Sequence, residues 1–274
     1  MDVILTHSNS DFDALASQQA AARLYGQAHA VLAPQLNANV AEFLGLHRNE
    51  LRLIERDEVP AEPVSRFILV DTDRVWGEWP TTDATETIVI DHHARGEGAG
   101  NPAASAGATT TLLVGRLLEN GLPLSPTEAT LFLLGIYEDT GDLTYTDTTP
   151  ADVRMVAALL ERGGDLGVLA HYRHRALTAD QDRAYQALFD QLHSHELLGW
   201  PILTGWAQLD QHTPGLSGLA ERLRDIYAPA ALVLALGIGS GGTQLVGRSD
   251  GVALDMGLLM REWGGGGHAQ AAAA

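Results

Sequence analysis

The sequence predicts an α/β protein: an N-terminal parallel sheet with helices on both faces, a helical connector and a smaller α/β C-terminal domain. Two observations indicate this fold class. Short apolar runs alternate with longer helical patterns up to about residue 160, which is typical of a parallel sheet covered by helices. A second pattern, of strands and one helix, follows a polar helical segment. The length of 274 residues suits one large domain or two modest ones.

The N-terminal domain is expected over residues 1–164. Its strands are predicted at residues 3–5, 30–32, 67–70 and 88–90. The last two are short, continuously apolar runs, as buried parallel strands are. Its helices are predicted at about residues 13–25, 108–119, 126–137 and 151–162.

The segment 165–195 is polar and helical in pattern, and we expect it to connect the two domains. The C-terminal domain is then expected over residues 196–274. Its elements are predicted to be a strand at 201–209, a helix at 215–227 and paired strands at 230–236 and 243–248, with glycine-rich turn residues between the paired strands. Four glycines and a histidine, Gly264 to His268, precede an alanine-rich tail.

The charge balance argues against a protein that binds long duplex nucleic acid. Seventeen basic residues stand against 35 acidic ones, a formal net charge of −18, whereas such proteins usually present a basic surface. A short phosphorylated ligand stays compatible with this charge, provided that bound cations supply positive charge at the site. An acidic surface that only keeps the protein soluble is the simpler alternative, and both explanations can hold together.

Composition also limits the compartment. The chain has no cysteine, which excludes disulfides, thiolate metal ligands and a cysteine nucleophile. No apolar run approaches the roughly 20 residues that span a bilayer. The N-terminal residues lack the basic flank and apolar stretch of a signal peptide. We therefore expect a cytoplasmic protein without a membrane partner.

Acidic and histidine side chains form four clusters, and three of them follow predicted strands. In chain order they are His7-Ser-Asn-Ser-Asp11-Phe-Asp13, Asp71-Thr-Asp73, Asp91-His92-His93 and, at the end of an apolar helix, Glu138-Asp139-Thr-Gly-Asp142. Because the carboxyl ends of parallel strands form one edge where ligands bind, three clusters should converge there. Crowded carboxylates repel unless cations neutralise them. Mixed Asp and His ligands without sulfur favour two Mn²⁺ ions, with Mg²⁺, Fe²⁺ or Co²⁺ as candidates.

Single residues of these types usually have structural roles. An isolated aspartate at a strand end is most often a helix cap or turn residue. His171 and His174 have the spacing of a metal pair on a helix, but no nearby acid completes a ligand set. Asp73 and Asp142 are interpreted as structural acids. The occurrence of all four clusters at successive element ends is what favours a metal site.

At these positions the sequence resembles the DHH phosphoesterase family, which is named for the triplet seen here as Asp91-His92-His93. Residues 7–13 resemble the family's first motif, Asp71 matches its second, and Gly135-Ile-Tyr-Glu-Asp139-Thr-Gly141 its fourth. The tail at 264–268 resembles the signature of the DHH-associated C-terminal domain. Five motifs in family order cover essentially the whole chain. The residues of these motifs, including Phe12, are most similar to those of a subgroup whose members are fused to CBS domains and a tRNA nucleotidyltransferase.

The resemblance implies two metal sites that share one ligand. One metal would be held by His7, Asp11 and Asp71, and the other by Asp13, Asp71, His92 and Asp139. Asp91 would orient a ligand histidine, and His93 would face the substrate phosphate. The C-terminal domain would bind substrate through Arg248, Ser249, Gly265, Gly266, Gly267 and His268, with the glycines letting backbone N–H groups approach phosphate. The alternatives are a flexible linker for the glycines and a solvated surface charge for Arg248.

These roles imply a manganese-dependent phosphoesterase in which water attacks phosphorus without a protein nucleophile. The substrate expected from the resemblance is a short nucleotide: a dinucleotide, an oligonucleotide of a few residues as for a nanoRNase, or a 3′,5′-bisphosphate nucleoside. Cyclic-dinucleotide hydrolysis by the same centre is the alternative. A pyrophosphatase is disfavoured by the C-terminal signature, and a long-DNA exonuclease by the negative charge.

A function of another class also stays open, namely a non-catalytic nucleotide-sensing module that regulates a fused partner. The completeness of the six candidate metal ligands favours catalysis over this alternative. A homodimer is compatible with the sequence, which does not specify the oligomeric state.

Overall fold

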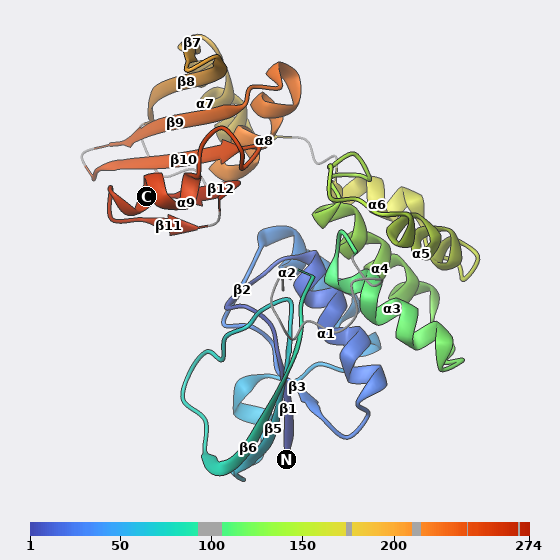
Figure 1. The fold of residues 1–274 in the computed structure, drawn as a ribbon. Coiled ribbons are helices and arrows are strands. Elements are labelled where there is room, and N and C mark those ends of the chain that lie inside the picture. Colours follow the sequence, from blue (N-terminus) through green and yellow to red (C-terminus); the bar gives the residue numbers. More distant parts are fainter. Residues whose placement is uncertain (93–105, 174–176, 210–214, 240, 268) are drawn as a thin grey trace. The chain divides into compact units, whose positions relative to one another are not determined.

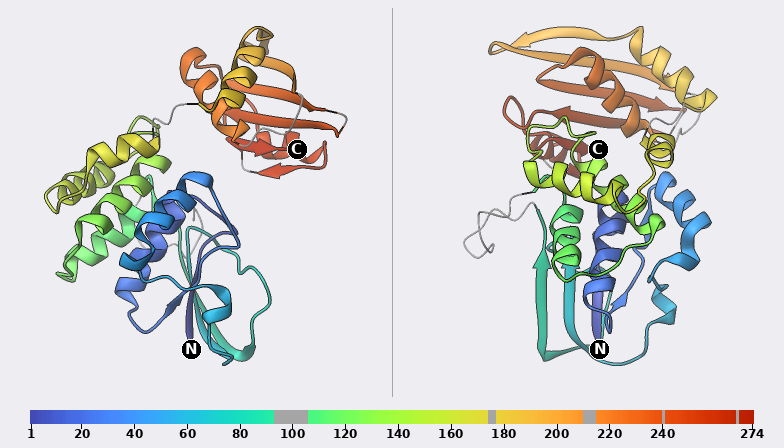
Figure 2. Two further views of the ribbon diagram at one scale, coloured as in Figure 1. Left: turned by 180° about the vertical axis from the view of Figure 1, so that it is seen from behind. Right: turned by 90° about the vertical axis from the view of Figure 1, so that its right-hand side faces the viewer.

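The computed structural model describes residues 1–92, 106–173, 177–209, 215–239, 241–267 and 269–274. The chain divides into two compact units, Met1–Arg175 (unit 1) and Ala176–Ala274 (unit 2), which Figures 1 and 2 show as ribbons from three directions. Each unit has its own sheet and its own buried core. The sequence-based prediction of a parallel-sheet domain followed by a smaller α/β domain is confirmed.

A four-stranded parallel sheet forms the centre of unit 1. Its strand order is β3-β1-β5-β6, and each neighbouring pair is parallel. The strands are β1 (Asp2–Leu5), β3 (His29–Ala30), β5 (Val64–Val70) and β6 (Thr81–Ile90). All four predicted strands are therefore present. The first part of β6 was not predicted because it is polar and largely exposed, as an edge strand can be.

Helices lie on one side of this sheet (Figure 1). They are α1 (Phe12–Leu24), α2 (Ala38–His47), α3 (Thr109–Glu119), α4 (Pro126–Asp139), α5 (Pro150–Leu160) and α6 (Leu166–Arg173). Helix α1 packs against the strands, α3 and α4 pack against α1, and α5 and α6 pack against α4. Ile4, Ile68 and Ile90 from the sheet share a buried cluster with apolar side chains of these helices. The helix α2 was not predicted, although its buried Val40, Phe43 and Leu44 follow helical spacing.

The opposite face of the sheet is covered by aromatic side chains and loops. Val3, Leu5 and Phe67 pack there with Trp76 and Trp79. The indole N–H of Trp76 donates to the carbonyl oxygen of Thr6 at 2.9 Å, which satisfies its polar atom. Within the described residues, this cover takes the place of the α-helices that the sequence led us to expect on the second face.

Two segments near the start of unit 1 bring the first acidic cluster to the end of the sheet. The short strands β2 (Asn9–Ser10) and β4 (Gln35–Leu36) pair in parallel just beyond β1. Asp11 then caps α1, since its side chain accepts a hydrogen bond from the backbone N–H of Ala14 at 3.0 Å. The strand-to-helix turn that holds residues 7–13 is thus fixed at both of its ends.

Unit 2 contains a mixed six-stranded sheet in the order β11-β12-β10-β9-β8-β7. The pair β8–β9 is parallel and is connected through α8, and the remaining pairs are antiparallel. Helices α7 and α8 cover one face and α9 the other. The elements are α7 (Ala179–Phe189), β7 (His193–Leu197), β8 (Trp200–Leu209), α8 (Leu216–Tyr227), β9 (Ala231–Ile238), β10 (Thr243–Ser249), α9 (Met256–Arg261), β11 (Gly266–Gly267) and β12 (Ala271–Ala273).

The segment 165–195, expected as a connector, is divided between the units at residues 175 and 176. Its first helix, α6, places Leu169 and Tyr172 in the core of unit 1. Its second helix, α7, places Ala184 and Leu188 in the core of unit 2. Each helix has an apolar face that must be buried, and each buries it against a different sheet or helix layer. The strand β7 also begins inside this segment.

Helix length and polarity bear on membrane association. Among the ranges that the structure describes, no helix is both long enough and apolar enough to cross a bilayer.

Candidate metal centre

The structure brings the six predicted ligands together in two overlapping groups. The first group contains His7, Asp11 and Asp71. The second contains Asp13, Asp71, His92 and Asp139. Within each group the potential ligand atoms all lie within 4.8 Å of one another. Asp71 is the member of both groups, as the sequence resemblance implied for a bridging ligand.

The fold explains this convergence. His7 follows β1, Asp71 follows β5 and His92 follows β6, so all three lie at the carboxyl edge of the parallel sheet. The backbone N–H of Asp71 donates to the carbonyl oxygen of Ile90 at 3.0 Å, which extends the β5–β6 pairing by one residue. Asp71 has a φ of 57°, a left-handed conformation that aspartate tolerates better than most residues.

Asp139 reaches the same place as the last residue of α4. The last turn of this helix contains two acids, Glu138 and Asp139, and no basic residue. The negative end of the helix dipole disfavours carboxylates at this position. A bound cation would remove that unfavourable interaction.

His7 neutralises part of the acidic charge in the absence of metal. Its Nε2 atom lies 3.7 Å from Asp11 Oδ2 and 3.4 Å from Asp71 Oδ2. Burial opposes protonation, but the hydrogen bonds and charges of the two carboxylates prevail and raise the pKa of His7 to about 10. A metal that binds here must therefore displace a proton from this imidazole.

Three of the four carboxylates in the two groups resist ionisation. Burial, followed by the charge of Asp13, raises the pKa values of Asp71 and Asp139 well above their ordinary range. Burial likewise raises the pKa of Asp13. For Asp11, burial is outweighed by the hydrogen bond to His7, and its pKa lies below the ordinary value. Divalent cations would favour the ionised form of all four groups at once.

The donor set fits divalent metals. It consists of four carboxylates and two imidazoles without sulfur, which suits Mn²⁺ and related ions. His92 Nε2 lies 3.0 Å from Asp139 Oδ2 and 3.9 Å from Asp71 Oδ1, so both carboxylates face the imidazole. The residues predicted from sequence to bind two metals therefore have the chemistry and the proximity to do so.

Asp13 also has a structural role that the sequence did not reveal. Its two carboxylate oxygens accept hydrogen bonds from the backbone N–H groups of Thr109 and Thr110, both at 2.9 Å. The N-cap of α3 is Ala108, which has no side-chain acceptor, so Asp13 caps this helix from a distant part of the chain. Asp13 is completely buried.

Glu138, Arg173 and Asp142 form a supporting network behind the centre. Glu138 Oε2 accepts a hydrogen bond from the backbone N–H of Phe12 at 2.6 Å, between Asp11 and Asp13 in the sequence. Burial and the charge of Asp11 raise the pKa of Glu138 to about 7. Arg173 Nε donates to Asp142 Oδ1 at 2.9 Å, and Arg173 Nη1 lies 4.0 Å from Glu138 Oε1. Asp142, interpreted from sequence as structural, pairs with this arginine.

The remaining predicted residues are Asp91, expected to orient a ligand histidine, and His93, Ser249 and His268, expected to contact substrate. Asp91 directly follows β6 and is half-buried. His93 and His268 lie outside the described residues. Ser249 is buried, and its hydroxyl accepts a hydrogen bond from the backbone N–H of Gly251 at 3.0 Å. The orienting role of Asp91 and the contact of the other three residues with substrate stay predictions.

Arg248 is held inside unit 2. Its Nε donates to Glu221 Oε2 on α8 at 2.8 Å, and its side chain is 13% exposed. The alternative of a solvated surface charge therefore does not describe this residue.

The glycines at 265–267 have a structural explanation. Gly266 and Gly267 form β11, which pairs with β12. A Cβ at Gly265 would meet the carbonyl oxygen of Ala273, and Gly267 has a φ of 139°. The close approach of the two strands therefore requires glycine at both positions. The segment is an ordered hairpin element, which argues against a flexible linker.

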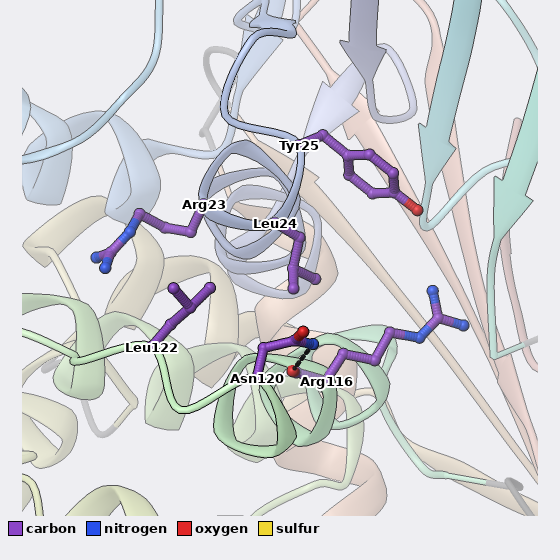
Figure 3. A pocket seen from close by; sticks show the side chains of 6 residues that line it. All are labelled: Arg23, Leu24, Tyr25, Arg116, Asn120 and Leu122. Carbon is purple, nitrogen blue, oxygen red and sulfur yellow. Dashed lines mark hydrogen bonds between the residues drawn. The ribbon is translucent and has the colours of Figure 1, made fainter.

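A separate recess of about 480 Å³ lies in unit 1, lined by Arg23, Leu24, Tyr25, Arg116, Asn120 and Leu122 (Figure 3). It includes the carboxyl end of α1, whereas Asp11 and Asp13 flank the start of that helix. A helix of 13 residues is about 20 Å long, so the recess is distinct from the metal centre.

The pair His171 and His174 is not supported as a metal site by the described residues. His171 Nε2 lies 3.6 Å from Glu42 Oε1 in a partly exposed ion pair. His174 lies outside the described residues.

The parallel sheet and the carboxylates and histidines at its edge define unit 1 as an α/β domain suited to binding divalent cations. Residues 3–136 match the DHH family, N-terminal domain. The resemblance inferred from the sequence motifs is therefore confirmed.

The whole chain also aligns with parts of two longer proteins. It is 36% identical to an A-adding tRNA nucleotidyltransferase of Geobacter sulfurreducens, with 100% of this chain and 32% of that protein aligned. It is 30% identical to an A-adding tRNA nucleotidyltransferase of Aquifex aeolicus, with 99% of this chain and 32% of that protein aligned. The chain thus spans about a third of the length of these relatives.

Among solved structures, an exopolyphosphatase-related protein of Bacteroides fragilis has a similar fold. The TM-score is 0.74 at 17% identity, over 100% of this chain and 86% of that chain. This likeness shows that both units follow a known arrangement of elements.

Proposed function

We propose that this chain is a metal-dependent phosphoesterase that hydrolyses short nucleotides, with Mn²⁺ as its preferred metal. The observation that supports the proposal is the pair of ligand groups that share Asp71, in a domain of the DHH family. Without cations, the repulsion among four crowded carboxylates at one sheet edge would destabilise the fold. Divalent cations bound there would neutralise these carboxylates.

The residues of the centre have distinct tasks in the proposed reaction. Two divalent cations would lower the pKa of the attacking water and would neutralise charge on the phosphoryl oxygens. Asp71 would be a ligand of both cations, and His92 and Asp139 would complete one ligand set. His7 would release its proton when the centre is loaded, because its neutral form is the ligand. His93 is proposed to contact the phosphate.

The substrate class rests on charge and on the resemblance. A net charge of −18 disfavours long duplexes, whose binding depends on neutralising many phosphates. A dinucleotide, an oligonucleotide of a few residues or a bisphosphate nucleoside presents few phosphates, which two cations can neutralise. The name of the aligned relatives supports a second candidate function. In it, this chain would bind or trim an RNA end for a nucleotidyltransferase to which it is fused.

A substrate panel tests the proposal. The purified chain is incubated with Mn²⁺, Mg²⁺, Co²⁺ or chelator and offered dinucleotide, 5-mer, 20-mer, cyclic dinucleotide, bisphosphate nucleoside, pyrophosphate and tRNA. We expect Mn²⁺-dependent turnover that is fastest for the dinucleotide or bisphosphate. Asp71→Asn protein, purified in parallel, controls for contaminating nuclease. Absence of metal-dependent turnover of every substrate would refute the proposed enzymatic activity. Equal turnover of the 20-mer and the dinucleotide would refute the proposed preference for short substrates.

Metal binding should also stabilise the protein. At a Mn²⁺ concentration 100-fold above the Kd, one site adds about 2.7 kcal/mol to the free energy of unfolding. For a chain of this size that corresponds to a rise in Tm of about 5–10 °C. Differential scanning fluorimetry with Mn²⁺, followed by excess chelator, measures the rise and its reversal. A Tm that none of Mn²⁺, Mg²⁺ and Co²⁺ alters would contradict the presence of a metal centre.

A further inference from the structure

Thr109 is a residue that no sequence motif identified, and it contacts three members of the metal centre. It is the first residue of α3 and is completely buried. Its backbone N–H donates to Asp13 Oδ2 at 2.9 Å. Its hydroxyl donates to Asp71 Oδ1 at 3.1 Å and accepts the backbone N–H of His92 at 3.2 Å.

These three contacts connect three separate parts of the fold. Asp13 belongs to α1, Asp71 follows β5 and His92 follows β6. The hydroxyl group satisfies one donor and one acceptor at once, as a threonine hydroxyl can. Because Thr109 has 0% exposure, water has no access to replace these hydrogen bonds if the hydroxyl is removed. The hydroxyl therefore connects the carboxylate of Asp71 to the backbone of His92.

We propose that Thr109 is the positioning residue of the metal centre, holding Asp71 and His92 in the orientation that lets one cation bind between them. This inference rests on the proposed function and extends it to a residue outside the ligand set. A carboxylate with one oxygen fixed by a donor keeps its remaining lone pairs directed at the metal, and loss of such a partner typically costs about 10–100-fold in metal affinity. The hydroxyl, and not the methyl group, is the part of Thr109 that performs this role.

The test compares Thr109→Ser with Thr109→Ala. Both substitutions remove the methyl group, and only serine keeps the hydroxyl. Isothermal titration with Mn²⁺ alone should show wild-type affinity for Thr109→Ser and an affinity about 10–100-fold lower for Thr109→Ala. Thr109→Val, which keeps the size of the side chain, should behave as Thr109→Ala does. Equal Mn²⁺ affinities for wild type, Thr109→Ala and Thr109→Val would overturn the inference.

Thr111 provides a matched control on the same helix. It is buried, and its hydroxyl donates to Asp152 Oδ1 at 2.6 Å, away from the metal ligands. Thr111→Val should lower the Tm while leaving the Mn²⁺ affinity within about threefold of wild type, because the lost hydrogen bond supports the fold only. A loss of Mn²⁺ affinity in Thr111→Val as large as in Thr109→Val would assign the effect to general destabilisation and overturn the inference.

The titration also separates this inference from the proposed function. Wild-type protein that binds no Mn²⁺ would overturn both. Wild-type protein that binds two Mn²⁺ ions, with Thr109 variants that bind them equally well, would overturn the positioning role alone and leave the metal centre in place.

Discussion

Replacement of Asp71 by asparagine is expected to reduce kcat/KM by more than about 100-fold, the upper range seen when only a supporting residue of a metal ligand is lost. Asp71 is the member of both ligand groups, so its loss affects both cations. Asparagine keeps the size of the side chain and tolerates the φ of 57° at this position, which alanine does not. Its amide oxygen can still accept the hydrogen bond from Thr109. The measurement is Mn²⁺-dependent turnover of a dinucleotide.

Stability should move in the opposite direction from activity in this variant. Burial and the charge of Asp13 raise the pKa of Asp71 well above its ordinary value, so the metal-free fold disfavours the ionised side chain. The neutral amide removes that repulsion, and metal-free Asp71→Asn should unfold at a Tm equal to or above that of wild type. The increase in Tm on addition of Mn²⁺ should be lost. A variant that is inactive because it is unfolded would show the reverse, a lower metal-free Tm.

Asp73→Asn is the control for this prediction. Asp73 lies two residues further along the same loop, and its carboxylate is 75% exposed, 3.5 Å from Arg74. Exposed ion pairs of this kind contribute little to stability. Activity, metal-free Tm and the response to Mn²⁺ should therefore all stay at wild-type values. Retained activity in Asp71→Asn would contradict the bridging role.

The sequence predicted the ligand cluster because the relevant rules are local. The apolar runs before Asp71 and Asp91 are recognisable as strands, and parallel strands end at one edge of a sheet. Once the strands were placed, their following acids and histidines had to converge. The same reasoning located Asp139 only as the end of an apolar helix, and the resemblance to a family was needed to assign it to the centre.

The supporting residues could not be predicted in this way. The contact between Glu138 and the backbone of Phe12 joins positions 126 residues apart, and that between Thr109 and Asp71 joins positions 38 apart. Threonine at the start of a helix and glutamate at its end are common residues with many roles. Their function here depends on how α1, α3 and α4 pack, which no periodicity in the sequence records.

In unit 2 the missed elements depend on tertiary context. The strand β7 is a fully exposed edge strand with a polar sequence, and β12 consists of alanines, which have low strand propensity. Pairing with β8 and β10 places them in the sheet. Arg248 was expected to face the substrate, and its ion pair with Glu221 involves a helix that begins 32 positions earlier. Sequence patterns describe single elements well and contacts between distant elements poorly.

Gly135 is expected to be the position where the smallest possible change disrupts the centre. It lies in α4, within the stretch that resembles the fourth family motif, where α1, α3 and α4 approach one another. A Cβ at Gly135 would lie 2.6 Å from Thr110 Oγ1, 2.8 Å from Ala16 Cβ and 3.1 Å from the carbonyl oxygen of Phe12. Relief of these contacts requires α1 or α3 to move. That movement would displace the backbone between Asp11 and Asp13. It would also displace the N–H group of Thr110, which donates a hydrogen bond to Asp13.

Gly115 in α3 offers the matched comparison, because a Cβ there would meet nothing within 4 Å. Replacing a glycine inside a helix by alanine stabilises the helix by about 0.5–1 kcal/mol, so Gly115→Ala should raise the free energy of unfolding by that amount. At Gly135 the same gain is opposed by overpacking, which costs about 1–3 kcal/mol, so Gly135→Ala should be destabilised and should bind Mn²⁺ more weakly. Urea unfolding and Mn²⁺ titration measure the two effects. Changes of equal sign and size in both variants would show that the close approach of the three helices does not set the geometry of the centre.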